Sequence, residues 1–277
     1  MRFVLLGAEA APRFGAIVSD AARSAGLRLL SVARGEWGSA AAPAYRLEER
    51  EVVADMWLPV GEAGLGGDDH LWAFDFPAVR VEGSGAQAEY LHVEWRALTW
   101  AFLQECPAHV WNRFDLLSPV WTLEPLPFLL TELRGLSTLR TPDLACAAEP
   151  PGAGWRPWPR SAAGGSTENS PNGSRIFWRV ERPGPLHLAV LVGEEALTFR
   201  VEPSMERCEA PAELLADLRT VRERRGLDYL EALLVPEGGR WTALRLGTSP
   251  GLVEAVAEGH GRALGEAVSA HLARGGA

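Results

Sequence analysis

The sequence contains no lysine, and all 27 of its basic residues are arginine. Genomic base composition is one explanation of this bias, but the chemical consequence is the same whatever its cause. A chain without lysine cannot form a Schiff base, use a lysine as a general base or hold a phosphate with a lysine ammonium group. These three kinds of site are therefore excluded.

Cysteine is also scarce. The three cysteines, Cys106, Cys146 and Cys208, lie far apart and form no CxxC pair. Neither a disulfide framework nor a cysteine zinc site is predicted from such spacing, and no other metal site is expected. A reducing cytoplasm is the simplest location for this chain.

An excess of positive charge and long apolar runs are lacking as well. The net charge of -9 argues against a broad nucleic-acid surface, because such a surface needs an excess of cations to displace counterions. No stretch of 18 apolar residues occurs, and the start, MRFVLLGAEAAPRFG, has too short an apolar stretch for a signal peptide. We therefore expect no membrane partner.

The chain does have an ordinary globular composition, with 47% hydrophobic and 23% charged residues over 277 positions. A first apolar run, Phe3 to Leu6, is followed by an Ala-rich helical stretch through Gly26 and by a second run, Leu27 to Val32. This β-α-β pattern predicts the start of a parallel sheet. A dinucleotide site is disfavoured, because GAEAAPRFG lacks the GxGxxG spacing.

The middle of the chain combines helices with an irregular stretch. Residues Ala86 to Leu103 predict an amphipathic helix, and a second helix is expected from Pro125 to Arg134. The apolar side of the first helix is predicted to contain Tyr90, Trp95, Leu98 and Phe102. Residues 149–174 are rich in Pro, Gly and Ser, which predicts a flexible loop or linker.

The C-terminal part alternates between strand and helix patterns. The runs RIFWRVE, LHLAVLV and ALTFRVE predict an antiparallel meander. A helix from Ala212 to Arg225 follows, then two strands joined by a turn at residues 237–239, and a last helix from Val253 to Leu272.

Three segments in this order resemble the ATP-grasp fold, and more closely its peptide-ligase branch of ribosomal-protein glutamate ligases and graspetide synthetases. EWRALTWAFLQECPAHVWNRFD resembles the helix and asparagine turn that close the pre-grasp domain, with Asn112 at the asparagine. EPLPFLLTELRGLSTLRTPDL resembles the entry into the ATP-grasp domain. RGLDYLEALLVPEGGRWTALRLGTSPGLVEAV resembles the final Leu-Asp-Tyr strand, the hairpin, the metal-ligand strand and the Asn-Thr-Ser-Pro turn.

This resemblance implies an α/β (α+β) fold with two domains. Residues 1–122 correspond to a pre-ATP-grasp-like domain with a parallel sheet. Residues 123–277 correspond to a truncated ATP-grasp-like domain with an antiparallel sheet and flanking helices. The family's lid subdomain, which contributes a second phosphate lysine, coincides with the irregular stretch before Gly193, so a reduced lid is expected.

The departures from the family pattern concern nucleotide and metal binding. Glu124 stands where the family has a lysine that contacts nucleotide phosphate, and a carboxylate would repel that group. Arg245 and Gly247 stand where the family has a glutamate and an asparagine aimed at Mg²⁺. A guanidinium has no lone pair for a metal, and glycine has no side chain. Genomic bias explains a change from lysine to arginine, but none of these three changes.

Two further constellations are interpreted as structural. Gly247-Thr248-Ser249-Pro250-Gly251 matches the GxSxG pattern of a hydrolase, but Pro250 lacks the amide that the oxyanion hole needs. His260 and His271 on the last helix are interpreted as surface residues. The acid-rich segment with Asp68, Asp69, His70 and Asp75 is interpreted as a solvated loop.

The sequence has 11 tryptophans. Trp95, Trp100, Trp178 and Trp241 are expected in the core. Exposed aromatic side chains beside arginines suit a protein or peptide partner. We therefore predict a partner surface in the irregular stretch, formed by Trp155, Arg156, Trp158 and Arg160.

Three functional hypotheses follow. The first is a pseudo-ligase, a degenerate ATP-grasp-like protein that binds a peptide, metabolite or partner protein without ATP-dependent ligation, and for which no cofactor is expected. The second is a divergent carboxylate-amine ligase in peptide modification, which would need ATP and Mg²⁺ and a rearranged site of Arg200, Arg245 and Asp228. The third is an unrelated α/β binding module. Asn112 and Ser249 are further candidate ligand-binding residues, no catalytic residue is assigned, and homo-oligomerisation stays open.

Overall fold

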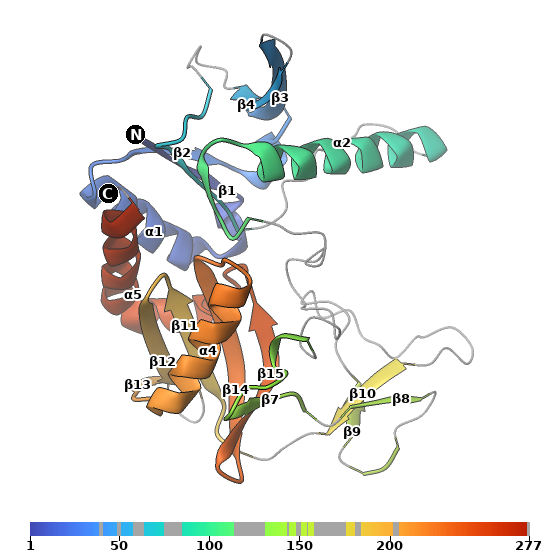
Figure 1. Ribbon diagram of the computed structural model, residues 1–277, viewed down its shortest axis with the longest axis vertical. Coiled ribbons are helices and arrows are strands. Elements are labelled where there is room, and N and C mark those ends of the chain that lie inside the picture. The colour runs from blue at the N-terminus through green and yellow to red at the C-terminus, as the bar shows by residue number, and fades with distance from the viewer. Residues whose placement is uncertain are drawn as a thin grey trace.

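A computed structural model describes residues 1–38, 41–48, 51–57, 64–74, 85–113, 131–142, 144–147, 151–153, 155–157, 176–180, 184–201 and 205–275. Figure 1 shows a parallel sheet in the upper part of the view and a larger antiparallel sheet below it, with α1 and α5 beside them. Among the described residues, no helix is long and apolar enough to cross a membrane.

The N-terminal part contains a four-stranded parallel sheet in the order β2, β1, β5 and β6. These strands are Arg28–Val32, Arg2–Leu6, His70–Ala73 and His109–Trp111. Helix α1 (Pro12–Ser24) connects β1 to β2, as the β-α-β pattern predicted. A hairpin of β3 (Ala42–Glu48) and β4 (Glu51–Trp57) lies at the top of Figure 1.

Helix α2 (Ala86–Glu105) confirms the predicted helix but not its predicted apolar face. Phe102 is buried, whereas Trp95 is only partly buried and Tyr90 and Leu98 are 60% and 36% exposed. Within the described part of the chain, the C-terminal end of the helix is the part that packs on the parallel sheet. There, Phe102 and Leu103 join a core with Val4 and Leu71.

The C-terminal part contains a six-stranded sheet in the order β13, β12, β11, β14, β15 and β7. Its strands are Glu206–Cys208, Glu195–Arg200, His187–Val192, Tyr229–Glu237, Arg240–Gly247 and Leu139–Arg140. Neighbours are antiparallel except for β15 and β7, which pair in parallel. The turn between β14 and β15 has positive φ at Gly238 and Gly239, as turn glycines permit.

Two helices cover opposite faces of this sheet. Helix α4 (Ala212–Arg224) and helix α5 (Glu254–Gly275) agree with the predicted helices. Side chains alternate along a strand, so β11 directs Leu188 and Val190 to the core that contains α5 and directs Ala189 to the core that contains α4. The sheet is therefore buried on both faces.

A separate three-stranded antiparallel sheet, at the lower right of Figure 1, consists of β8 (Leu144–Ala147), β10 (Ile176–Val180) and β9 (Trp155–Pro157). It corrects two predictions. Strand β10 pairs with β8 and β9, so the predicted three-stranded meander is reduced to the hairpin of β11 and β12. Residues 155–157, assigned to a loop, form a strand because their backbone pairs with β10.

One core joins the two sheets. Helices α1 and α5 pack against each other, and their apolar side chains meet those of β1, β11, β12 and β14. Among the tryptophans whose side chains the structure describes, the buried ones are not those that the sequence indicated. Trp37, Trp72 and Trp111 are at most 2% exposed, while Trp95, Trp100 and Trp241 are only partly buried. The side chain of Trp178 lies outside the described part of the structure.

Candidate functional site

Asn112 lies at the junction between the parallel sheet and the six-stranded sheet. It follows β6 in a left-handed conformation with φ 54°, which asparagine tolerates better than most residues. Its Nδ2 donates to the carbonyl oxygens of Tyr229, at 2.7 Å, and Thr248, while its Oδ1 accepts the backbone N–H groups of Asp228 and Tyr229, both at 2.8 Å. One side chain thus connects β6, the start of β14 and the turn before α5.

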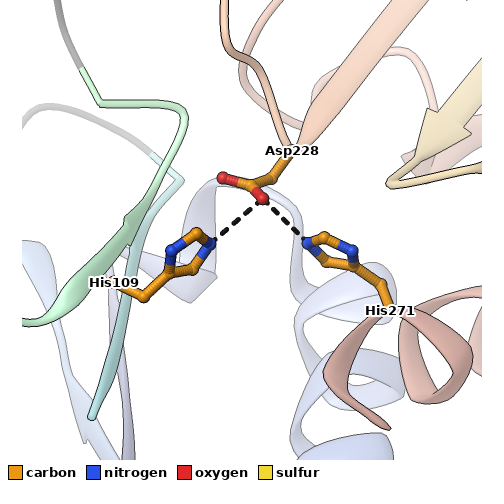
Figure 2. Close-up of side chains that lie close together, drawn as sticks. All are labelled: His109, Asp228 and His271. Carbon is orange, nitrogen blue, oxygen red and sulfur yellow. Dashed lines mark hydrogen bonds and ion pairs between the residues drawn. The ribbon is translucent and has the colours of Figure 1, made fainter. Parts of the chain in front are cut away.

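Asp228 is held between two histidines from distant elements, as Figure 2 shows. Its Oδ1 lies 3.1 Å from Nε2 of His109 on β6 and 2.9 Å from Nε2 of His271 on α5. Burial acts to raise the pKa of Asp228, but the hydrogen bonds from both imidazoles outweigh it and place the pKa below its usual range. The same carboxylate raises the pKa of His109 above its ordinary value.

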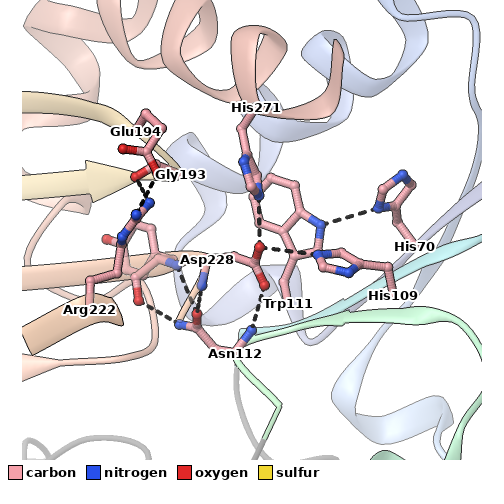
Figure 3. A network of polar contacts seen from close by, with 10 residues as sticks. His70, His109, Trp111, Asn112, Gly193, Glu194, Arg222, Asp228 and His271 are labelled. Atoms are coloured by element: carbon pink, nitrogen blue, oxygen red, sulfur yellow. Dashed lines mark hydrogen bonds and ion pairs between the residues drawn. The ribbon is translucent and has the colours of Figure 1, made fainter. Parts of the chain in front are cut away.

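Aromatic rings fix the orientation of the two histidines. His271 makes an edge contact with Trp111 at a centroid distance of 4.6 Å, and His109 makes one with His70 at 5.5 Å. Trp111 Nε1 donates to Nδ1 of His70 at 3.4 Å (Figure 3). Burial, and then the two neighbouring histidines, lower the pKa of His70.

Arg222 supports the same junction from the side of α4. It donates to the carbonyl oxygen of Gly193 and, at 2.5 Å, to the carboxylate of Glu194 (Figure 3). Gly193 has a positive φ of 54°, and a Cβ there would lie 2.2 Å from Nδ1 of His271. Glycine is therefore required for His271 to pack against this turn.

Glu231 on β14 forms a second polar centre, which sequence reasoning missed. It is fully buried, and its carboxylate accepts the N–H groups of Leu252 at 2.9 Å and Val253 at 3.1 Å at the beginning of α5. The hydroxyl of Tyr229 donates to it at 2.9 Å. Burial raises the pKa of Glu231 in spite of these donors. A glutamate within an apolar strand is the sequence signal from which this buried polar centre could have been predicted.

Arg245 and Gly247 lie next to this carboxylate. Nη2 of Arg245 is 3.9 Å from Oε1 of Glu231. A Cβ at position 247 would lie 2.8 Å from Cγ and 2.9 Å from Oε1 of Glu231. The space in front of Gly247 is therefore filled by the side chain of Glu231.

No protein-family model and no curated protein matches this chain. Solved structures do match it. A RiPP-associated ATP-grasp ligase from Chryseobacterium gregarium, in complex with ADP and a leader and core peptide, has a TM-score of 0.72 at 10% identity and covers 99% of this chain and 97% of its own. Macrocyclase MdnB from Microcystis aeruginosa MRC has a TM-score of 0.73 at 12% identity and covers 98% of this chain and 99% of its own. The chain has the ATP-grasp fold.

A third match agrees with this assignment. The ATP-grasp ligase PsnB, complexed with minimal precursor, Mg and ADP, has a TM-score of 0.66 at 16% identity and covers 98% of each chain. At such low identity the similarity is one of fold. The predicted fold class and the resemblance to the ATP-grasp fold are thereby confirmed.

The positions where the resemblance implies metal ligands do not fit Mg²⁺ in this ATP-grasp fold. Arg245 offers no lone pair, and Gly247 offers no side chain. Glu231, which fills the space at Gly247, already accepts hydrogen bonds from backbone N–H groups and a tyrosine hydroxyl and has no exposed surface. Glu124, the third departure, lies outside the described residues.

The structure brings only some of the predicted site residues together. Asn112 and Asp228 meet at the sheet junction, where the backbone N–H of Asn112 lies 3.4 Å from Oδ2 of Asp228. Arg200 instead pairs with Glu206 at 2.5 Å on the far strands of the sheet, and Arg245 lies beside Glu231. Ser249 is buried in the turn before α5. The predicted grouping of Arg200, Arg245 and Asp228 therefore has no support in their contacts.

The predicted partner surface is described only in part. Trp155 and Arg156 lie on β9, opposite Val180 and Arg179 of β10. Their side chains, and the whole of Trp158 and Arg160, lie outside the described residues. This surface stays a prediction.

Two interpretations of polar residues were wrong. His271 is not a surface residue, because its side chain is 17% exposed and bonds to Asp228, and His260 is partly buried against Phe199. Asp69 and His70 are not in a solvated loop, since they are 5% and 3% exposed and Asp69 bonds to Arg2. Both errors arose because burial depended on packing against distant elements. Asp68 is exposed, as expected, and Asp75 lies outside the described residues.

Proposed function

We propose that this protein is a pseudo-ligase, an ATP-grasp-like scaffold that binds a peptide, metabolite or partner protein without ATP-dependent ligation. The observation that carries the proposal is the side chain of Glu231, which fills the space where a residue at position 247 would reach a metal. Because its carboxylate is bonded to backbone N–H groups at the start of α5, it is not free to act as a replacement ligand.

Arg245 supports the same proposal. Its guanidinium lies on the strand where the resemblance implies a carboxylate, and its Nη2 lies 3.9 Å from the buried carboxylate of Glu231. A cation at this point would repel Mg²⁺. Restoring a metal site would therefore require simultaneous changes at 231, 245 and 247.

A peptide is the ligand class that the similar proteins favour. The ligase from Chryseobacterium gregarium is in complex with a leader and core peptide, and PsnB is complexed with a minimal precursor. The exposed apolar side chains of α2, which include Tyr90, Leu91 and Val93, would offer contact area to an extended chain. The surface predicted around Trp155 and Trp158 is a second place where such a ligand would bind.

Isothermal titration calorimetry with ATP in the presence and absence of Mg²⁺ tests the proposal. We expect no metal-dependent binding of ATP, because the metal-ligand positions hold Arg245 and Gly247. PsnB, measured in the same buffer, is the positive control. Metal-dependent binding at micromolar ATP would contradict the pseudo-ligase proposal.

A triple variant that combines Glu231→Ala, Arg245→Glu and Gly247→Asn is the matched control for this chain. It empties the space that Glu231 fills and restores the two side-chain types that bind Mg²⁺. If the variant folds, as judged by circular dichroism, we expect Mg²⁺ binding to appear in it. Binding of Mg²⁺ to the unchanged protein that is equal to that of the variant would contradict our account of these positions.

The second candidate is a divergent carboxylate-amine ligase. It is favoured by the near-complete overlap with RiPP ATP-grasp ligases, which covers 97% to 99% of both chains in the comparison with the Chryseobacterium protein. Incubation with ATP, Mg²⁺ and a peptide distinguishes this candidate. A ligase would release ADP and produce a peptide that is lighter by one water, which mass spectrometry detects. Neither product is expected from a pseudo-ligase.

A further inference from the structure

Three potential ligand atoms converge at the junction of the two sheets, away from Arg245 and Gly247. They are Nε2 of His109, Nε2 of His271 and a carboxylate oxygen of Asp228, and all lie within 4.8 Å of one another. Each comes from a different element: β6, α5 and the start of β14. Figure 2 shows both imidazole rings directing a nitrogen to the same side chain.

The spacing of these atoms is close to that around a transition metal. In a tetrahedral zinc site with bonds of about 2.0–2.2 Å, neighbouring ligand atoms lie about 3.3 Å apart. Here the carboxylate oxygen Oδ1 is 3.1 Å from one imidazole nitrogen and 2.9 Å from the other. A small rotation of His109, whose side chain is 48% exposed, would adjust the remaining separation.

The two oxygens of Asp228 have different partners. Both histidines approach the single oxygen Oδ1, while Oδ2 faces the backbone N–H of Asn112 at 3.4 Å. A single carboxylate oxygen accepts two hydrogen bonds, so these contacts hold both imidazole nitrogens beside Oδ1 before an ion binds. The two nitrogens and this oxygen are thereby already assembled as a set of potential ligands within 4.8 Å of one another.

The neighbouring groups hold these ligands in place. Trp111 contacts the ring of His271, His70 contacts the ring of His109, and the N–H of Asn112 orients the carboxylate. Residues that contact the ligands in this way maintain the geometry of metal sites. The exposed side of His109 provides an entry path from solvent.

We propose that His109, Asp228 and His271 bind one divalent transition-metal ion of the zinc class. Imidazole nitrogens suit Zn²⁺, Co²⁺ and Ni²⁺, whereas Mg²⁺ prefers oxygen ligands, so this site is distinct from the one expected for an ATP-grasp ligase. Three protein ligands leave a coordination position open for water or another donor. The ion would connect the N-terminal sheet with the C-terminal part of the chain, and it is independent of the pseudo-ligase proposal.

Cobalt binding tests this proposal. The protein is prepared without a polyhistidine tag, stripped with EDTA and titrated with Co²⁺ while visible absorption is recorded. We expect ligand-field bands that saturate at one equivalent and are displaced by Zn²⁺. We also expect Zn²⁺ to raise the melting temperature and EDTA to reverse that rise, because a ligand that binds only the folded state stabilises it.

Single substitutions locate the ion. His109→Gln and His271→Gln are each expected to weaken binding by more than the roughly 10- to 100-fold that the loss of an outer partner costs. His260→Gln, on the same helix as His271, is the matched control and should leave binding unchanged. If His271→Gln fails to fold, His109→Gln carries the test, because the half-exposed ring of His109 is not part of the core. Absence of binding to the unchanged protein, or equal binding to all three variants, would overturn the proposal.

Discussion

At the scale of single residues, Gly247 and Glu231 depend on each other. The glutamate side chain occupies the space that any side chain at 247 would need, so the glycine permits a buried carboxylate at the start of α5. Arg245 offsets part of the cost of burying that charge from 3.9 Å away. The side chains of Glu231 and Arg245 thus contact other groups of the same protein.

Gly247→Ala should be destabilising. The added Cβ would lie 2.8 Å from Cγ of Glu231, a distance that forces the buried carboxylate to move. We expect a loss of about 1–3 kcal/mol in the free energy of unfolding, as for other overpacked cores. Urea denaturation measures the change.

Gly259→Ala is the matched control, because a Cβ at this position of α5 meets nothing within 4 Å. Gly259 directly precedes the kink of α5 at His260, so the exchange is expected to change the free energy of unfolding by less than about 0.5 kcal/mol, as surface substitutions usually do. If Gly247→Ala were as stable as Gly259→Ala, the close packing of Glu231 against position 247 would be refuted.

At the scale of elements, helix α4 holds the entry to β7 through one side chain. The carboxylate of Asp217 accepts the backbone N–H groups of Thr138 at 2.7 Å and Leu139 at 2.9 Å, and the hydroxyl of Thr138 at 2.7 Å. Burial acts to raise the pKa of Asp217, but these donors outweigh it and lower the pKa. The short parallel strand β7 therefore depends on α4 as well as on β15.

Asp217→Asn should loosen this connection. The amide presents a donor where the carboxylate accepted, so we expect a loss of about 2–3 kcal/mol at neutral pH, within the range for hydrogen bonds to charged groups. Because the folded-state pKa is lowered, the contribution of Asp217 is present above its unfolded pKa and lost as the pH falls through the folded one. The difference between the two proteins should therefore shrink below about pH 4.

Urea denaturation at pH 7 and pH 3 checks this expectation. Asp20→Asn is the control, since the carboxylate of Asp20 is 77% exposed on α1. A difference in stability that stays constant between the two pH values would contradict the role assigned to the ionised carboxylate.

At the scale of the whole molecule, the N-terminal and C-terminal sheets are joined by a shared core and by Asn112. The core contains α1 and α5, and the side chain of Asn112 is hydrogen-bonded to the backbone of Asp228, Tyr229 and Thr248. All of these groups come from the C-terminal part, so the side-chain amide of Asn112 fixes the position of β6 relative to the six-stranded sheet.

Asn112→Ala should weaken this junction. The substitution leaves two N–H groups and two carbonyl oxygens without the amide, and it places an alanine at φ 54°. We expect a loss of about 3 kcal/mol or more, because each unsatisfied buried group costs about 1–3 kcal/mol. Calorimetric unfolding should show a lower and broader transition.

Asn112→Gly separates the two causes, because glycine adopts the left-handed conformation without strain. Relative to Asn112→Ala, this variant should regain only the free energy that the backbone strain costs, about 1 kcal/mol. If Asn112→Gly were as stable as the unchanged protein, the hydrogen bonds of Asn112 would have no role in joining the two sheets.

Much of the fold was predictable from local patterns. The β-α-β start, α4, the turn at Gly238 and Gly239, and α5 follow from periodicity and turn chemistry, which act over a few residues. The sequence motifs also indicated Asn112 and Asp228 as residues of interest. The placement of β10 could not be inferred, because strand patterns do not specify which partner a strand takes.

The sequence by itself indicated most of the helices and strands, excluded lysine chemistry, and placed Arg245 and Gly247 at the positions where the resemblance implies metal ligands. Only the tertiary structure decided that Glu231 fills the space at Gly247 and that His109, Asp228 and His271 meet. The physical reason is that these contacts join residues more than ten positions apart in the sequence, and His109 and Asp228 are more than a hundred positions apart. The packing of α5 and β6 on the C-terminal sheet brings them together. The spacing of residues along the chain does not indicate such packing.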